Sequence, residues 1–310
     1  MTRIVCIGEC MVELRAVGED TFARSYAGDV YNTAVYLKRS LPDAQVQFLT
    51  ATGDDAMSTA MRRTWHAQGI DDALAFSVEG GSVGLYLIET DAVGERSFHY
   101  WRTGSAARGW LALLQARGES ILRGADILYL SGITLAILSP DERAAAIELL
   151  RRLRGHVGRI AFDPNVRPRL WQSQQAAAQS MRAAMSACDI ALPSAEDLAW
   201  LFHVDEPMQQ VDLLMEMGVS EVALTRGANG CAVAGGALRT QLAAAKVARV
   251  IDTSGAGDAF NGVYLANRLQ GSSPEEAAKA ALQVASRVVT HAGAVIPASV
   301  SHPANPQAFR

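Results

Sequence analysis

The sequence predicts an α/β fold in which helices cover a mostly parallel central sheet and a small second β-sheet stands apart. Short β-rich runs recur at 4–8, 46–50, 125–132, 159–163, 188–193 and 221–227. Helical patterns lie between most of these runs, at 56–68, 140–154, 174–187 and 208–217, and two more follow at 257–269 and 274–290. Strands that alternate with helices are typical of βαβ units, whose strands run parallel.

Two early segments, 11–27 and 83–102, depart from the alternation of strands and helices, because their patterns are typical of hairpins. In the second segment, GLYLIET and RSFHYWR flank the turn DAVGE. We expect both segments to form the small sheet and to act as a lid over a site, within a single domain spanning 1–310. The exposed edge of such a lid can pair with a second copy of the chain, so the lid is also a candidate homo-oligomer contact.

Composition excludes several classes of protein. The 310 residues are 49% hydrophobic and 19% charged, which suits one globular unit with a sizeable core. A net charge of −4 with dispersed basic residues argues against a nucleic-acid partner. The longest apolar stretch, 127–138, is too short to span a bilayer, and the N-terminus is typical of a first strand rather than a signal peptide. We therefore expect a cytoplasmic protein without a membrane partner.

Several common motifs are missing. The four cysteines have no metal-ligand spacing, and we expect Cys6 and Cys10 to be buried free thiols. The chain contains no G-x-x-x-x-G-K-[ST] motif and only three lysines, which excludes a P-loop kinase. The first strand is not followed by G-x-G-x-x-G, so a dinucleotide-binding oxidoreductase loses its main support.

The most informative segment is VIDTSGAGDAFNGVYLANRL, residues 250–269. A strand end leads into small residues at 255–257 and then into a helix, a geometry in which backbone N–H groups and the helix dipole favour an anion. Asp258, at the start of this helix, can direct its carboxylate to the same point and act as a general base. The pattern therefore predicts an anion hole at Gly255, Ala256 and Gly257 that stabilises a transferring phosphoryl group.

This segment resembles the C-terminal signature of the ribokinase-like (PfkB) carbohydrate kinases. AGDVYNTAVYL, residues 27–37, resembles the first signature of the same family, and the similarity extends through nearly the whole chain. Segments 7–14, 84–102, 128–140 and 162–171 resemble the subgroup that acts on 2-keto-3-deoxygluconate. The resemblance implies a three-layer αβα sandwich with a β lid, and phosphorylation of this sugar acid with ATP and Mg²⁺.

The resemblance also implies roles for individual residues. Expected substrate contacts are Gly28, Asp29, Asn32, Tyr86, Tyr100, Trp101, Arg102, Arg167 and Asp258. Expected nucleotide contacts are Asn165, Arg167, Ser194, Thr225, Arg226, Gly227, Ala228, Gly230, Gly255, Ala256, Gly257 and Ser286. A sugar acid carries a carboxylate, which the fork of an arginine binds well, so Arg102 and Arg167 are the expected partners of that group.

Two stretches depart from the family pattern. Ser194-Ala195-Glu196-Asp197 stands where relatives often carry Asn-x-x-Glu, so Glu196 and Asp197 are the candidates to hold the metal through water. Val166 stands where the family often has tyrosine. Two alternative functions stay open: a kinase for fructose, ribose or 2-keto-3-deoxygalactonate, and a catalytically silent sugar-binding regulator on the same fold.

Overall fold

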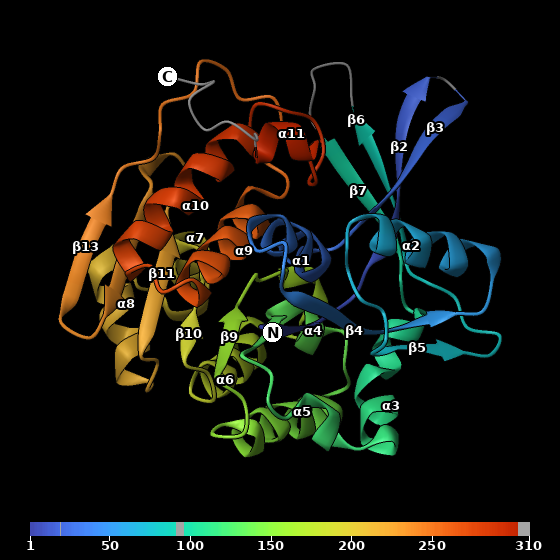
Figure 1. Ribbon diagram of the computed structural model, residues 1–310, viewed down its shortest axis with the longest axis horizontal. Helices are drawn as coiled ribbons and strands as arrows, with labels where there is room; N and C mark the ends of the chain where they lie inside the picture. Colours follow the sequence, from blue (N-terminus) through green and yellow to red (C-terminus); the bar gives the residue numbers. More distant parts are fainter. Residues whose placement is uncertain (19, 91–95, 303–310) are drawn as a thin grey trace.

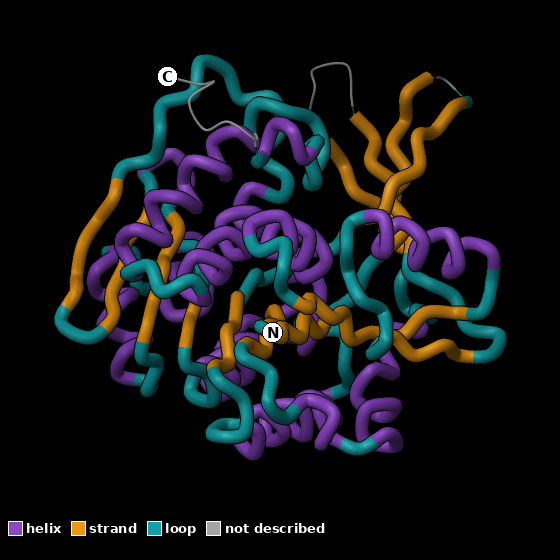
Figure 2. Tube along the Cα trace, in the orientation of Figure 1, coloured by secondary structure: helices purple, strands orange, loops and turns teal. Residues whose placement is uncertain are grey.

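A nine-stranded sheet forms the centre of the protein (Figures 1 and 2). The structure is a computed structural model, and it describes residues 1–18, 20–90 and 96–302. The strands lie in the order β13 (Leu238–Leu242), β12 (Cys231–Gly235), β11 (Glu221–Thr225), β10 (Ile190–Ala191), β9 (Arg159–Asp163), β8 (Ile127–Ser131), β1 (Arg3–Ile7), β4 (Gln45–Gly53) and β5 (Ala75–Val78). From β11 to β5 neighbouring strands are parallel, whereas β12 and β13 are antiparallel. The predicted mostly parallel sheet is confirmed.

Helices cover both faces of this sheet (Figure 1). One face packs against α1 (Asp29–Ser40), α2 (Ala56–Ala67), α9 (Ala256–Leu269) and α10 (Pro274–Val288). The other face packs against α3 (Trp110–Arg117), α5 (Pro140–Leu153), α6 (Gln174–Met185), α7 (Ala195–Phe202) and α8 (Pro207–Glu216). Two short helices, α4 (Gly132–Ala136) and α11 (Ala298–Ser301), complete the set in the described ranges. Strands covered on both sides need apolar residues throughout, which is why β8 reads ILYLS and is buried at every position.

The second sheet contains β3 (Thr21–Ala27), β2 (Met11–Gly18), β6 (Leu85–Thr90) and β7 (Arg96–Trp101), in this order. Strands β2 and β6 pair in parallel and so join the two hairpins. Figure 1 shows this sheet rising from one side of the main body. The expected turn DAVGE, residues 91–95, lies outside the described residues. The fold class, a large mostly parallel sheet with a small separate one, is as the sequence predicts.

Smaller expectations need correction. The strand expected at 188–193 is reduced to β10, because residues 186–188 still form the turn that ends α6, and because Pro193 lacks the N–H that would extend the ladder. The last long helix ends at Val288 rather than at 290. All four cysteines are buried and free, as expected for Cys6 and Cys10. Within the described ranges, no helix is long and apolar enough to cross a membrane.

Candidate active site

The amino-terminal ends of α1 and α9 meet above the carboxyl ends of the parallel strands. The two helices pack backbone to backbone, because Gly262 leaves room for α1: a Cβ at this position would lie 2.5 Å from the carbonyl oxygen of Thr33. This contact brings Asn32 and Asp258 together, and the Nδ2 of Asn32 donates to the Oδ2 of Asp258 at 2.8 Å. Residues 226 positions apart in the sequence thus share one hydrogen bond.

Asp258 lies in the first turn of α9, half-buried, after a turn that only glycine suits. Gly255 has φ 74°, and a Cβ there would lie 2.4 Å from the carbonyl oxygen of Ala294. No side chain caps this helix, and although the N–H of Ala256 donates to the carbonyl oxygen of Thr253 at 3.3 Å, the amides that follow it can bind an anion. Burial, followed by the charge of Asp29, raises the pKa of Asp258 to about 7, against the opposing effects of Asn32 and Arg167. A carboxyl group with this pKa can accept a proton at neutral pH.

A hydrogen-bond network lies beside Asp258, and sequence reasoning missed two of its members, Asp163 and Asn261. Asp163, at the end of β9, accepts hydrogen bonds from the Nδ2 of Asn261 at 2.8 Å and from the backbone N–H of Asn165 at 2.9 Å. The side chain of Asn165 in turn donates to Asp29 at 2.7 Å. Burial and the neighbouring carboxylates raise the pKa of Asp163 well above its usual range. The available signal was the spacing of Asp258 and Asn261, three residues apart and hence on one helix face.

The expected metal candidates lie at the start of α7. Ser194 caps this helix by accepting from the backbone N–H of Asp197 at 3.1 Å, and Asp197 accepts from the N–H of Val166, also at 3.1 Å. Burial raises the pKa of Asp197 to about 6, although the Ser194 hydrogen bond and Arg167 oppose this effect. Glu196 is exposed. In the part of the chain that the structure describes, no group of three or more acidic, histidine or cysteine side chains could hold a metal. This donor set fits a hydrated cation rather than a protein cage.

A further group of expected nucleotide residues lies directly after β11 and near the end of α10. Thr225 ends β11 and forms a bridge with Ser194, and the next residues form a short 3₁₀ turn, 227–229, that includes Ala228. Gly230 has φ 87°, and a Cβ there would lie 1.9 Å from the carbonyl oxygen of Leu242. The guanidinium of Arg226 donates to the side chain of Gln241 and to the backbone of this turn, so its contacts here are structural. Ser286 is half-buried on α10.

The expected lid residues differ in exposure. Tyr86 is buried and donates to Glu13, and its ring stacks on Tyr100 with centroids 5.6 Å apart. Tyr100 and Trp101 are exposed on β7, at 48% and 59%.

The two expected arginines also differ. The guanidinium of Arg102 forms an ion pair with buried Glu9. Arg167, in contrast, is exposed, and its Nη1 donates to the backbone oxygen of Val166 at 2.9 Å. Neither Glu9 nor Glu13 was among the expected site residues, although each is an acid within an otherwise apolar segment.

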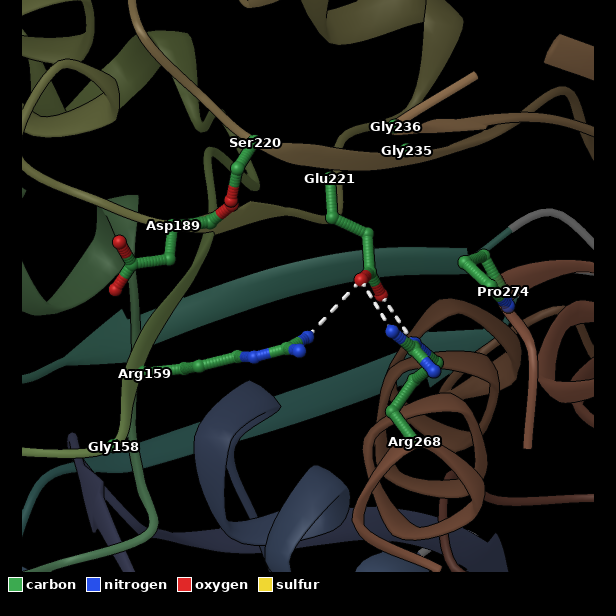
Figure 3. A pocket seen from close by; sticks show the side chains of 9 residues that line it. All are labelled: Gly158, Arg159, Asp189, Ser220, Glu221, Gly235, Gly236, Arg268 and Pro274. Carbon is green, nitrogen blue, oxygen red and sulfur yellow. Dashed lines mark hydrogen bonds and ion pairs between the residues drawn. The ribbon is translucent and has the colours of Figure 1, made fainter. Parts of the chain in front are cut away.

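A cavity of about 490 Å³ lies at the opposite, amino-terminal ends of β9 and β11 (Figure 3). In its wall, buried Glu221 accepts hydrogen bonds from Arg268 and Tyr264, and it forms a further ion pair with Arg159 at 3.1 Å. Both carboxylate oxygens of Glu221 are therefore occupied, and the cavity offers a ligand no unpaired buried group among the described residues. We assign the candidate active site to the carboxyl ends of the strands, where α/β sheets bind ligands.

Comparison with known proteins identifies the family and the fold of the chain. The sequence pattern described as pfkB family carbohydrate kinase matches residues 1–300. The chain is 41% identical over 302 residues to the 2-dehydro-3-deoxygluconokinase of Escherichia coli K12, covering 95% of this chain and 97% of that protein. It is 42% identical over 303 residues to the enzyme of the same name from Dickeya dadantii, covering 95% and 96%. The crystal structure of aminoimidazole riboside kinase from Salmonella enterica, at 23% identity, superposes with a TM-score of 0.82 over 96% of both chains, which confirms the ribokinase-like fold.

Proposed function

The chain belongs to the pfkB family of carbohydrate kinases, and from this premise we propose that it phosphorylates 2-keto-3-deoxy-D-gluconate at the 6-hydroxyl with ATP. Two relatives that share about two fifths of their residues with nearly the whole chain are named 2-dehydro-3-deoxygluconokinase. The observation that carries the chemistry is Asp258, whose pKa is raised to about 7 at the uncapped start of a helix.

In the proposed reaction, Asp258 accepts the proton of the 6-hydroxyl while the oxygen of that hydroxyl forms a bond to the γ-phosphorus of ATP. The bond between the γ-phosphorus and the β-bridging oxygen breaks, and ADP leaves. The amides at Ala256–Asp258 and the dipole of α9 stabilise the charge on the transferring group. Asn32 holds the carboxylate of Asp258 in position through its 2.8 Å hydrogen bond.

Substrate recognition is proposed to use the first turn of α1 and the second sheet. Gly28, Asp29 and Asn32 contact the hydroxyls and the keto end, and Arg102 and Arg167 bind the carboxylate. Tyr86, Tyr100 and Trp101 close over the sugar as a lid and exclude water, which suppresses hydrolysis of ATP.

ATP is proposed to bind between α7, the turn after β11 and α10. The contacts would come from Asn165, Ser194, Ser286 and the run Thr225–Gly230. Mg²⁺ suits the phosphates, and it would be held mainly by water and phosphate oxygens, with Asp197 and Glu196 acting through water. Because ATP and sugar acids are intracellular metabolites, we also propose a cytoplasmic location.

The second sheet is a proposed contact between copies of the chain. Its edges are β3 and β7, each of which pairs with a single strand among the described residues. Large apolar side chains are exposed on these strands, namely Phe22, Phe98, Tyr100 and Trp101. Unpaired strand edges with exposed apolar groups favour association.

A coupled assay of ADP release over a panel of substrates tests the proposed function. The panel contains 2-keto-3-deoxy-D-gluconate, its galactonate epimer, fructose and ribose, each with Mg-ATP. We expect the highest kcat/KM with 2-keto-3-deoxy-D-gluconate. A higher kcat/KM with a neutral sugar would replace the proposed substrate, and no turnover with any of them would favour a silent regulator.

A further inference from the structure

Glu9 lies at the junction between the two sheets, in the three-residue connection from β1 to β2. Its side chain is only 2% exposed, and its Oε2 forms the ion pair with Arg102 described above. The backbone of Glu9 also lies against the start of α1, because a Cβ on Gly28 would come within 2.1 Å of its carbonyl oxygen. Glu9 therefore links the lid, the main sheet and the helix that carries Asn32.

Two polar atoms of this ion pair are buried without a partner. Among the described residues, neither the Oε1 of Glu9 nor the Nε of Arg102 makes a hydrogen bond. Oε1 faces Gly84, where a Cβ would lie only 2.9 Å away. An unpaired carboxylate oxygen in a buried place is unfavourable, and ligand donors commonly satisfy such atoms.

Stability alone does not explain the ion pair between Glu9 and Arg102. Removing two charges from water is costly, and apolar side chains of similar volume often stabilise a fold as well or better. A negative charge close to an anionic substrate also opposes binding, unless it makes a contact that the substrate needs. The Oε1 acceptor beside the small Gly84 offers such a contact to a hydroxyl.

From this geometry we propose that Glu9 is a specificity-determining residue in the sugar-acid site. Its Oε2 fixes the guanidinium of Arg102 in place for the substrate carboxylate, and its Oε1 accepts a hydrogen bond from a neighbouring substrate hydroxyl. This inference rests on the proposed function, since it assumes a substrate with both a carboxylate and hydroxyl groups.

The direct test is Glu9→Gln in the full chain. We expect the KM for 2-keto-3-deoxy-D-gluconate to rise about ten- to a hundred-fold, the loss typical of a charge-assisted hydrogen bond, with kcat and the KM for ATP unchanged. The matched control is Glu221→Gln, which also alters a buried glutamate paired with arginine but lies at the opposite end of the sheet. That variant should lower the melting temperature and leave the KM unchanged. A Glu9→Gln protein with reduced stability and an unchanged KM would overturn the proposal.

A steric variant keeps the test open if Glu9→Gln does not fold. Gly84→Ala leaves every charge in place and puts a methyl group 2.9 Å from Oε1, while also approaching Met11 Cγ at 3.0 Å and Arg102 Cβ at 3.3 Å. It should raise the same KM, whereas Gly104→Ala, which meets no atom within 4 Å, should not. Equal KM values for both alanine variants would contradict a substrate contact at Oε1.

The two roles of Glu9 can be separated in an Arg102→Met background. If Oε1 contacts a hydroxyl directly, adding Glu9→Gln raises the KM further; if it adds nothing, Glu9 acts only through Arg102 and the direct contact is wrong. Should the wild-type protein phosphorylate only a neutral sugar, the proposed function fails on its own. The same variants are then measured with that sugar, where a raised KM supports the hydroxyl contact and an unchanged KM overturns it.

Discussion

The two ends of helix α9 carry or contact carboxylates in opposite surroundings, half-buried Asp258 at the amino end and buried Glu221 near the carboxyl end. Near its carboxyl end, burial alone would raise the pKa of Glu221, but hydrogen bonds from Arg268 and Tyr264 outweigh burial and lower it. At the amino end, burial and the charge of Asp29 raise the pKa of Asp258 to about 7, and the hydrogen bond from Asn32 only partly offsets them.

Because of this difference, Glu221 stabilises the fold, whereas Asp258 can take part in a reaction. Both carboxylate oxygens of Glu221 accept hydrogen bonds from the protein. The carboxylate therefore stays ionised and cannot accept further hydrogen bonds from a ligand. The carboxyl-terminal end of the sheet, in contrast, holds buried atoms that have no partner among the described residues, including Glu9 Oε1, Asn32 Oδ1 and Asn261 Oδ1. A bound substrate could satisfy such atoms.

The largest expected effect is on catalysis at the amino end of α9. Asp258→Asn should lower kcat by about 10²–10⁴-fold, because the general base is lost, while sugar-acid and ATP binding stay nearly intact. Steady-state rates together with calorimetric titration of both ligands check this. Near-normal turnover in the variant would remove Asp258 from the role of base.

At the other end of α9 the expected effect is on stability. Glu221→Ala should lower the free energy of unfolding by up to about 3–5 kcal/mol, because it leaves the partly buried guanidinium of Arg268 without its carboxylate partner. Chemical denaturation measures the loss, and the kcat of the remaining folded protein should match the wild type. A large fall in kcat without a loss of stability would mean that this cluster controls the active site.

Next in size is the contrast between the two arginines. Arg102→Met should raise the KM for the sugar acid about ten- to a hundred-fold, since a charge-assisted hydrogen bond contributes about 1.5–3 kcal/mol. Methionine keeps the apolar stem and so limits the loss of packing. Arg167→Met should also raise this KM, but less, because Arg167 is exposed and partly solvated.

The control for both arginines is a neutral analogue without the carboxylate. Neither variant should use it less well than the wild type does. An equal loss of kcat/KM for the acid and the analogue would show that the arginine supports the fold instead.

The smallest expected effect is on pH dependence. Since Asp258 must be ionised to act as a base, kcat should fall as the pH drops below about 7, its raised pKa. An unfolded aspartate ionises near pH 3.8, so between about pH 4 and 7 the unfolded chain binds fewer protons at this position than the native one. The contribution of Asp258 to stability therefore becomes more unfavourable as the pH rises through this window.

Asp258→Asn removes this pH-dependent contribution. The melting temperature of the variant should exceed that of the wild type by more at pH 8 than at pH 5. The same gain at both pH values would mean that Asp258 is ionised in the fold well below neutral pH.

Sequence patterns predicted the alternation of strands and helices, the two hairpin segments and the turn before Asp258. These features depend on residues that are close in the sequence. The small residues at 255–257, for example, allow the turn that starts α9. The Asp163–Asn261 hydrogen bond joins residues 98 positions apart, and the pairing of Glu9 with Arg102 depends on how two sheets meet. No local pattern specifies either contact, because both follow from tertiary packing.

The close helix contact at Gly262 limits which substitutions this protein can accept. Even alanine there would place a methyl group 2.5 Å from the α1 backbone and drive the two helices apart. Asn32 and Asp258 lie within about one helical turn of that contact. An apolar substitution at Gly262 would therefore disturb the hydrogen bond between Asn32 and Asp258. Variation that alters sugar preference is therefore better tolerated in the second sheet, away from the helix pair, and a library for new substrates should be built there.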